Sequence, residues 1–135
     1  MNIDQLGKFP VAGKEAREKP IKFYHIQRSK MLRTIKGETY PVSLTFHVSN
    51  DFLHVGELVI PPGGKGVRAS EPDSHDGDEA FYVEVGPIVV LFPDNGETFE
   101  VQEGETLYIP EGRKHQYMNY SSNVVKGIFA VAPNL

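Results

Sequence analysis

The sequence predicts an all-β domain, and three features of its composition and pattern support this class. Thirteen glycines and ten prolines among 135 residues indicate frequent turns, which favour short strands over long helices. Apolar and polar residues alternate along residues 42–48, the pattern of a strand with one buried face. The turn Asp94-Asn95-Gly96 separates two further β-like segments, and Asn-Gly in this position is a strong hairpin signal.

Short strands at regular spacing, with turns between them, predict an all-β sandwich or a closed barrel. Residues 1–20 show no apolar period, so we expect a surface arm with one helical turn at 13–20, either packed on a neighbouring subunit or partly ordered. We assign residues 1–40 to this arm and the first short strands, and residues 41–135 to the barrel of the same domain. The expected strands are 22–26, 31–35, 42–48, 52–60, 80–85, 88–92, 98–101, 106–109, 115–120 and 124–131.

Length and charge restrict the classes of function. A chain of 135 residues is long enough to enclose one core, and its net charge of −4, without a block of like charge, argues against a nucleic-acid partner. Because the chain has no cysteine, any transition metal must be held by His, Asp or Glu. The first residues lack the features of a signal peptide, and the longest apolar run, 88–92, is too short to cross a bilayer. We therefore expect a cytoplasmic protein without a membrane partner.

One stretch gathers several possible metal ligands. Asp73 and His75 are two residues apart, so on a strand they point to the same side. Asp76-Gly77 favours a reversal of the chain, which would bring Glu79 beside His75. A histidine flanked by two carboxylates is a chemically sensible partial metal site, although the same acidic residues could form a solvated turn.

A second stretch, residues 104–119, supplies another histidine and resembles a known motif. It is similar to the second motif of the cupin superfamily, G-x(5)-P-x-G-x(2)-H-x(3)-N, and it matches every fixed position. The matching residues are Gly104, Pro110, Gly112, His115 and Asn119. Glycine and proline are each only about 5–7% of an average protein, so five such matches rarely arise by chance.

The first stretch is similar to the first cupin motif, G-x(5)-H-x-H-x(3,4)-E-x(6)-G. His75, Glu79 and Gly86 fall at the required spacing, while Gly66 opens the stretch one residue early. The departure is the first histidine of the motif, which is Asp73 in this chain. Either Asp73 coordinates the metal, which we favour, or this position is left open for water or substrate.

The resemblance implies a single small cupin barrel, a jelly-roll-like double-stranded β-helix, that binds one divalent metal ion per chain. The ligands carried over by position are Asp73, His75, Glu79 and His115. This set is richer in oxygen than the usual three-histidine site, so it favours Mn or Fe(II) over Cu, with Zn and Ni possible. Cupins commonly pair through their barrels, so we also expect a homodimer.

Other residues are candidates for the cavity around the metal, and each has a plainer alternative. Phe81 and Tyr117 share faces with Glu79 and His115, and they would contact substrate or pack in the core. His47 and His54 would line the cavity or be ordinary strand histidines. Arg68 would meet a substrate carboxylate or lie exposed in a turn. The large side chains expected in the core are Phe23, Phe46, Phe92, Phe99 and Phe129.

The expected function is that of a metalloenzyme acting on a small oxygen-rich or carboxylate-bearing molecule through open coordination positions. The resemblance implies dioxygenation, decarboxylation, isomerisation or lyase-type elimination, and no residue separates these reactions. Tyr117 is the candidate acid or base, as is Asp73 if it is not a ligand. The alternative is a non-catalytic cupin that binds or senses a small ligand.

Overall fold

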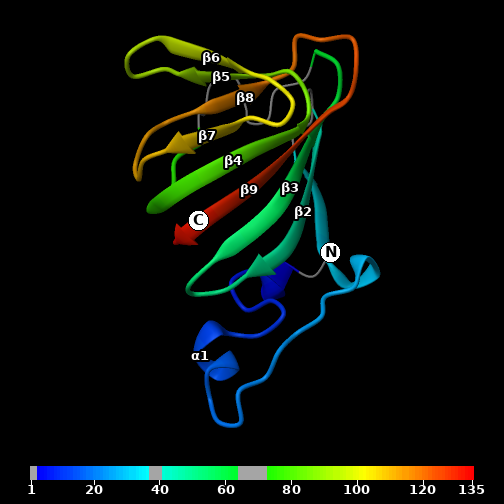
Figure 1. Cartoon of the computed structure of the whole chain (residues 1–135), viewed down its shortest axis with the longest axis vertical. Helices are drawn as coiled ribbons and strands as arrows, with labels where there is room; N and C mark the ends of the chain where they lie inside the picture. Colours follow the sequence, from blue (N-terminus) through cyan, green and yellow to red (C-terminus); the bar gives the residue numbers. More distant parts are fainter. Residues whose placement is uncertain (1–2, 37–40, 64–72) are drawn as a thin grey trace.

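Two antiparallel sheets form the body of the molecule. The computed structural model describes residues 3–36, 41–63 and 73–135. In this described part, one sheet has six strands in the order β1-β2-β3-β9-β4-β7, and the other has three in the order β6-β5-β8 (Figure 1). The strands are β1 (Leu32–Lys36), β2 (Val42–Ser49), β3 (His54–Ile60), β4 (Gly77–Val85), β5 (Ile88–Phe92), β6 (Glu97–Val101), β7 (Thr106–Ile109), β8 (Gln116–Met118) and β9 (Val125–Pro133).

The core lies between the sheets because inward positions alternate with outward ones. Along β4, Glu79, Phe81 and Val83 are buried, while the residues between them are exposed. From the other sheet, Ile88 and Val90 of β5 are fully buried against them. The all-β class and the jelly-roll architecture predicted from the sequence are therefore confirmed.

Most predicted strands are present, but the Asp76-Gly77 pair does not reverse the chain. Asp76 is a bend, and β4 begins at Gly77 and runs on without a hairpin. Gly77 serves a different purpose, because a Cβ at this position would lie 2.4 Å from the carbonyl oxygen of Ala132 in β9. The missing side chain lets two neighbouring strands approach each other closely.

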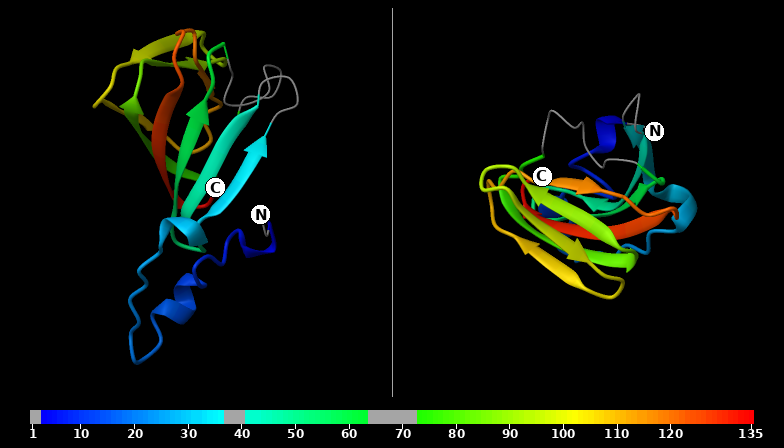
Figure 2. Two further views of the ribbon diagram at one scale, coloured as in Figure 1. Left: turned by 90° about the vertical axis from the view of Figure 1, so that its right-hand side faces the viewer. Right: turned by 90° about the horizontal axis from the view of Figure 1, so that it is seen from above.

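The segment before β1 folds back onto the turn between β2 and β3. It contains the 3-10 turns η1 (Ile3–Gln5) and η2 (Arg28–Lys30) and the short helix α1 (Gly13–Ala16). Phe9 exchanges two backbone hydrogen bonds with Ser49, and the Gly13 amide donates to Asp51 Oδ1 at 2.7 Å. The segment projects beyond the sheets in Figure 1 and in the left view of Figure 2. No helix in residues 3–36, 41–63 or 73–135 could cross a membrane.

The strand predicted at 22–26 is absent, and the core position predicted for Phe23 is wrong. Residues 21–27 are extended but pair with no strand among the described residues. Phe23 is 94% exposed, and Phe99 is also exposed, whereas Phe46 and Phe129 are buried and Phe92 packs partly buried against the core. A segment rich in β-branched and aromatic residues forms a strand only where a partner supplies hydrogen bonds, and 22–26 has no such partner among the described residues.

Candidate metal centre

Backbone hydrogen bonds hold the two predicted stretches side by side. The Asp73 amide donates to the His115 carbonyl, and the His115 amide donates to the Asp73 carbonyl, both at 2.9 Å. The Gly112 amide donates to the His75 carbonyl, also at 2.9 Å. This short antiparallel pairing extends the contact between β4 and β7, so residues about 40 apart in sequence meet at one place.

Three side chains converge where these stretches meet. One ligand atom each from Asp73, His75 and His115 lies within 4.8 Å of the others, a spacing that could hold a metal ion. The two imidazole rings are buried and their centroids are 5.1 Å apart. The Asp73 carboxylate is 52% exposed, and its Oδ2 lies 3.7 Å from His75 Nε2. The cluster therefore has a buried nitrogen side and a carboxylate that reaches solvent.

Glu79 supplies a second carboxylate to the same place. It points inward from β4, and its side chain is only 4% exposed. Its Oε1 lies 3.9 Å from His75 Nε2, and its Oε2 lies 3.2 Å from His115 Nε2. All four residues predicted as ligands are thus neighbours.

His115 is held in an orientation that suits a metal ligand. Its Nδ1 lies 2.9 Å from the carbonyl oxygen of Arg113, to which it donates a hydrogen bond, so Nε2 is the nitrogen that faces the cluster. Nε2 is buried and makes no hydrogen bond, because its approach to Glu79 is poorly directed despite the short distance. Burial by itself would lower the pKa of His115, but Glu79 outweighs it and the pKa is raised. A buried nitrogen without a partner, next to carboxylates, fits a bound cation.

Tyr117 holds the Glu79 carboxylate in place beside the two histidines. Its hydroxyl donates to Glu79 Oε2 at 2.7 Å, and its ring stacks on Phe81 with centroids 4.1 Å apart. Burial, followed by the Glu79 carboxylate, raises the pKa of Tyr117 well above its ordinary value of 10.0. The hydroxyl therefore keeps its proton at neutral pH and acts towards Glu79 as a hydrogen-bond donor.

The remaining cavity candidates have separate locations. His54 is buried near the site: its Nδ1 lies 2.9 Å from Ser49 Oγ, and burial, with a smaller effect of His75, lowers its pKa. His47 lies on the opposite face of the large sheet, 3.0 Å from Glu57, and does not face the cluster. Arg68 lies outside the residues that the structure describes.

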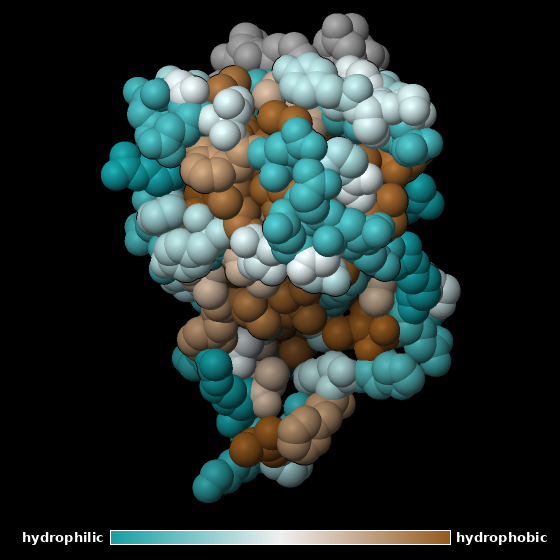
Figure 3. Space-filling model, turned by 45° about the horizontal axis from the view of Figure 1, so that its top comes forward, coloured by the Kyte–Doolittle hydropathy of each residue, from teal (hydrophilic) through white to brown (hydrophobic). Residues whose placement is uncertain are grey.

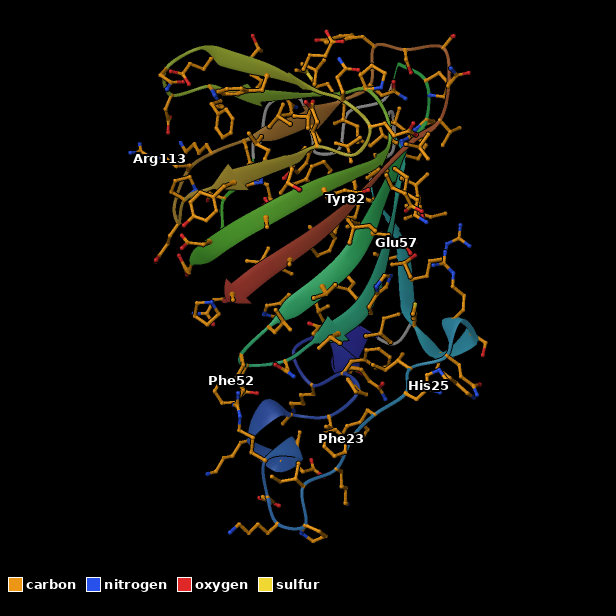
Figure 4. All side chains as sticks on the ribbon, in the orientation of Figure 1. Phe23, His25, Phe52, Glu57, Tyr82 and Arg113 are labelled. Atoms are coloured by element: carbon orange, nitrogen blue, oxygen red, sulfur yellow. The ribbon has the colours of Figure 1, made fainter. Side chains whose placement is uncertain are left out.

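Two features of the site were not predicted. The first is the Arg113 carbonyl, which orients His115 but leaves no signal in the sequence, because any residue has a carbonyl. The second is a groove of about 390 Å³ between β6 and β7 that the four predicted ligands do not line. The groove includes apolar, acidic and basic side chains from Phe92, Asp94, Glu97, Phe99, Leu107, Tyr108, Arg113 and Lys114. Arg113, one of these lining residues, is labelled in Figure 4.

Asn119, the last residue of the second motif, stabilises the fold near the candidate site through its side-chain hydrogen bonds. Its side-chain amide donates to the carbonyls of Ile60, Pro61 and Asn123, and its Oδ1 accepts from Ser121. It thereby fastens the end of β3 to the loop between β8 and β9. The buried amide has its hydrogen bonds satisfied and remains away from the metal ligands.

Comparisons with known proteins agree with this architecture. A family model described as a cupin domain matches residues 56–131. No curated protein sequence matches the chain significantly.

Solved structures with the same fold include enzymes of different kinds. The polyketide cyclase RemF from Streptomyces resistomycificus superposes with a TM-score of 0.64 at 19% identity, covering 82% of this chain and 80% of that one. A sugar phosphate isomerase of the cupin superfamily from Silicibacter pomeroyi gives 0.63 at 20% identity, covering 81% and 75%. The cupin domain of Cnp3 from Schizosaccharomyces pombe gives 0.60 at 16% identity, covering 74% and 68%. At these identities the likeness shows the fold alone.

Proposed function

This chain belongs to the cupin family, and from that premise we propose that it is a metal-dependent enzyme acting on a small, carboxylate-bearing or oxygen-rich molecule. The observation that supports the proposal best is the convergence of Asp73, His75 and His115, whose ligand atoms lie within 4.8 Å of one another. The buried Nε2 of His115 adds to it, because it makes no well-directed hydrogen bond although Glu79 Oε2 lies 3.2 Å away.

The residues that would hold the metal are Asp73, His75, Glu79 and His115. Two imidazoles and two carboxylates favour Mn or Fe(II) over Cu, while Zn and Ni also accept this set. Such an ion supplies Lewis acidity, which polarises an oxygen atom of the substrate. The chain itself contributes the exposed Asp73 carboxylate at the edge of the site and the Tyr117 hydroxyl, which holds Glu79 in place.

The groove between β6 and β7 supports a substrate with a carboxylate on a partly apolar body. Phe92, Phe99 and Leu107 offer apolar surface, and Arg113 offers a guanidinium that pairs well with a carboxylate. The carbonyl of the same Arg113 accepts a hydrogen bond from His115, so one segment both lines the groove and orients a ligand residue. Isomerisation, elimination, decarboxylation and dioxygenation all remain candidate reactions for such a centre, and substrate assays distinguish them.

A second candidate is a cupin that binds or senses a small ligand without chemistry. The observation that favours it is the aromatic packing beside the cluster, where Phe81 is fully buried and stacks on Tyr117. This packing fills space that a reacting molecule would otherwise occupy. A protein that holds metal stoichiometrically and binds small carboxylates without turning them over would support this candidate.

Elemental analysis of purified protein, expressed in medium replete with Mn, Fe, Zn and Ni, tests the metal centre. We expect about one divalent ion per chain in the wild type and at least a tenfold loss in His115→Ala, whose Nε2 is a proposed ligand atom. His25→Ala is the matched control, because His25 is exposed on the arm and its loss should leave the metal content unchanged.

The same measurement on Asp73→Ala decides the role of the residue that departs from the family pattern. We expect a smaller loss of metal than in His115→Ala, since the Asp73 carboxylate is half exposed and water can take its place. Full retention would make Asp73 a substrate contact or an acid–base group instead. Wild-type protein without any metal under these conditions would contradict the metalloenzyme proposal.

A further inference from the structure

The groove between β6 and β7 lies at one edge of the molecule, where the two sheets end. In the described part of the chain, β6 is the last strand of the small sheet and β7 is the last strand of the large sheet. The volume of the groove, about 390 Å³, is within the usual range of sites for small molecules, about 300–1,000 Å³. The size and position of the groove therefore suit a small ligand that enters from solvent.

The groove offers aromatic and aliphatic surface to such a ligand. Phe92 and Phe99 meet edge to face with ring centroids 5.7 Å apart, and Leu107 packs partly buried against the core. Phe99 is 41% exposed and Tyr108 is 60% exposed. In Figure 3, apolar surface on the body of the molecule adjoins hydrophilic side chains, the same combination that the groove contains. An apolar group placed on these rings would remove them from water, which favours binding.

Charges of opposite sign line the groove from two different connections. The acidic wall consists of Asp94, in the turn between β5 and β6, and Glu97, the first residue of β6. The basic wall consists of Arg113 and Lys114, between β7 and β8. Among the residues that the structure describes, none of these four charged groups has an ion pair or a hydrogen bond. Both walls can therefore bind the charged groups of a ligand.

Hydrogen bonds to the backbone fix both walls before any ligand binds. On the acidic side, the Glu97 amide donates to Asn95 Oδ1 at 3.1 Å. On the basic side, the Glu111 amide donates to Asp78 Oδ1 at 2.9 Å, and the Tyr108 hydroxyl donates to the same carboxylate. A ligand therefore meets connections that are already ordered, which lowers the entropic cost of binding.

We propose that the groove binds a zwitterion with an apolar side chain, of the class of the aromatic α-amino acids. The ligand carboxylate pairs with Arg113 and Lys114, and the ligand ammonium group pairs with Asp94 and Glu97. The ligand ring then lies against Phe99. The choice of this class rests on the proposed function, to whose carboxylate-bearing molecule it adds an ammonium group. A molecule with a carboxylate alone would leave the acidic wall without a partner and would be repelled by it.

Isothermal titration calorimetry with three related probes tests this class. The probes are L-phenylalanine, 3-phenylpropionate, which lacks the ammonium group, and phenethylamine, which lacks the carboxylate. We expect L-phenylalanine to bind once per chain and at least about fivefold more tightly than either of the others, because it alone engages both walls. Absence of L-phenylalanine binding, or equally tight binding of 3-phenylpropionate, would overturn the proposal.

Single substitutions in each wall show which charge the ligand contacts. Arg113→Gln should weaken L-phenylalanine and 3-phenylpropionate about fivefold and leave phenethylamine unchanged, whereas Glu97→Gln should weaken L-phenylalanine and phenethylamine only. Both positions are exposed, so we expect neither substitution to unfold the protein, and circular dichroism checks this. Lys30→Gln and Glu18→Gln are the matched controls, because they remove exposed charges from the segment before β1. Variants that weaken all three probes equally, or none, would contradict the two-wall assignment.

The titrations are made on the protein as purified and after treatment with a chelator, which separates the groove from the metal centre. Arg113→Gln keeps the carbonyl that orients His115, so its metal content should equal that of wild type. If metal is present but L-phenylalanine does not bind, the groove proposal is wrong and the metal centre stands. If L-phenylalanine binds as expected to a protein that never holds metal, the metalloenzyme proposal is wrong and the groove stands.

Discussion

Glu79 connects the two halves of the candidate site at the scale of single residues. One of its oxygens faces His75, and the other lies near His115 Nε2 while accepting from the Tyr117 hydroxyl. Without a metal, this carboxylate depends on Tyr117 for its one well-directed hydrogen bond among the described residues. Glu79 is therefore both a proposed ligand and the residue whose position Tyr117 sets.

Replacing Tyr117 with Phe should destabilise the metal-free protein by about 1–3 kcal/mol, because a buried carboxylate oxygen loses its donor. The measurement is urea unfolding in the presence of a chelator. Tyr24→Phe is the control, since Tyr24 is on the exposed arm and its hydroxyl should contribute less than about 0.5 kcal/mol. Equal stability of Tyr117→Phe and wild type would mean that water replaces the phenol at Glu79.

The sequence pattern was sufficient to predict which side chains meet at the candidate site, but not what surrounds them. His75, Glu79 and His115 were predicted because their types and spacing match two motifs, and Asp73 because it stands where the first motif has a histidine. The hydrogen bond from His115 to the Arg113 carbonyl had no such signal, and no pattern decided between core packing and substrate contact for Phe81 and Tyr117, which stack on each other. Backbone groups and ring geometry are fixed by packing, which one sequence does not encode locally.

At the scale of elements, strands were predicted well where they have partners. The segments that became β2, β5 and β7 agree with their predicted bounds to within one residue. The segment 22–26 is also rich in β-branched and aromatic residues, but it lies in the arm, where none of the strands in the described part of the chain pairs with it. Gly77 was interpreted as part of a turn because close approach between β4 and β9 cannot be deduced from local sequence.

The ion cluster around Glu57 ties η2 to β2, β3 and β9, and its charge makes it sensitive to acid. Burial raises the pKa of Glu57, but Arg28, Lys126 and His47 outweigh it, so the pKa falls below its ordinary value of 4.5. A carboxylate whose pKa is lowered by folding stabilises the protein above that ordinary value. This contribution is lost as the pH falls below 4.5 and through the lower pKa of the folded state.

Glu57→Gln should therefore lose stability less steeply than wild type between pH 5 and the acid unfolding limit. At pH 7 the variant should be less stable by about 1–3 kcal/mol, since Arg28 and Lys126 then face a neutral amide. Urea unfolding at a series of pH values measures both effects. Glu103→Gln, at an exposed loop position, is the control and should follow the wild-type curve. Parallel curves for Glu57→Gln and wild type would contradict the assignment.

At the scale of the whole molecule, the candidate centre joins parts of the chain that are distant in sequence. His75 and Glu79 come from the start of β4, while His115 comes directly before β8 in the other sheet. A metal ion bound to all of them would link the two sheets. The two motifs predicted that these ligand residues would lie close together. The ion cluster around Glu57 takes its residues from four elements and matches no motif, so it could not be predicted from the sequence.

Metal should consequently stabilise the folded protein as a whole. At a free Mn²⁺ concentration one hundred times the dissociation constant, the expected gain is about 2.7 kcal/mol, because the ion binds only the folded state. Thermal unfolding with and without Mn²⁺ measures this gain as a rise in Tm. His115→Ala should show no rise, and His25→Ala should rise as wild type does. A Tm of wild type that does not respond to any divalent ion would contradict a site linking the sheets.

The place of β9 has a consequence for how the chain is made. This strand lies between β3 and β4 and pairs with both, although it follows every other strand in the sequence. During synthesis on the ribosome, the edges of β3 and β4 that pair with β9 therefore have unpaired backbone groups until residue 133 has left the exit tunnel. Open apolar edges are the surfaces through which nascent chains associate wrongly. Substitutions that weaken β9 should then reduce the yield of correctly folded protein more than they reduce the stability of the molecules that do fold.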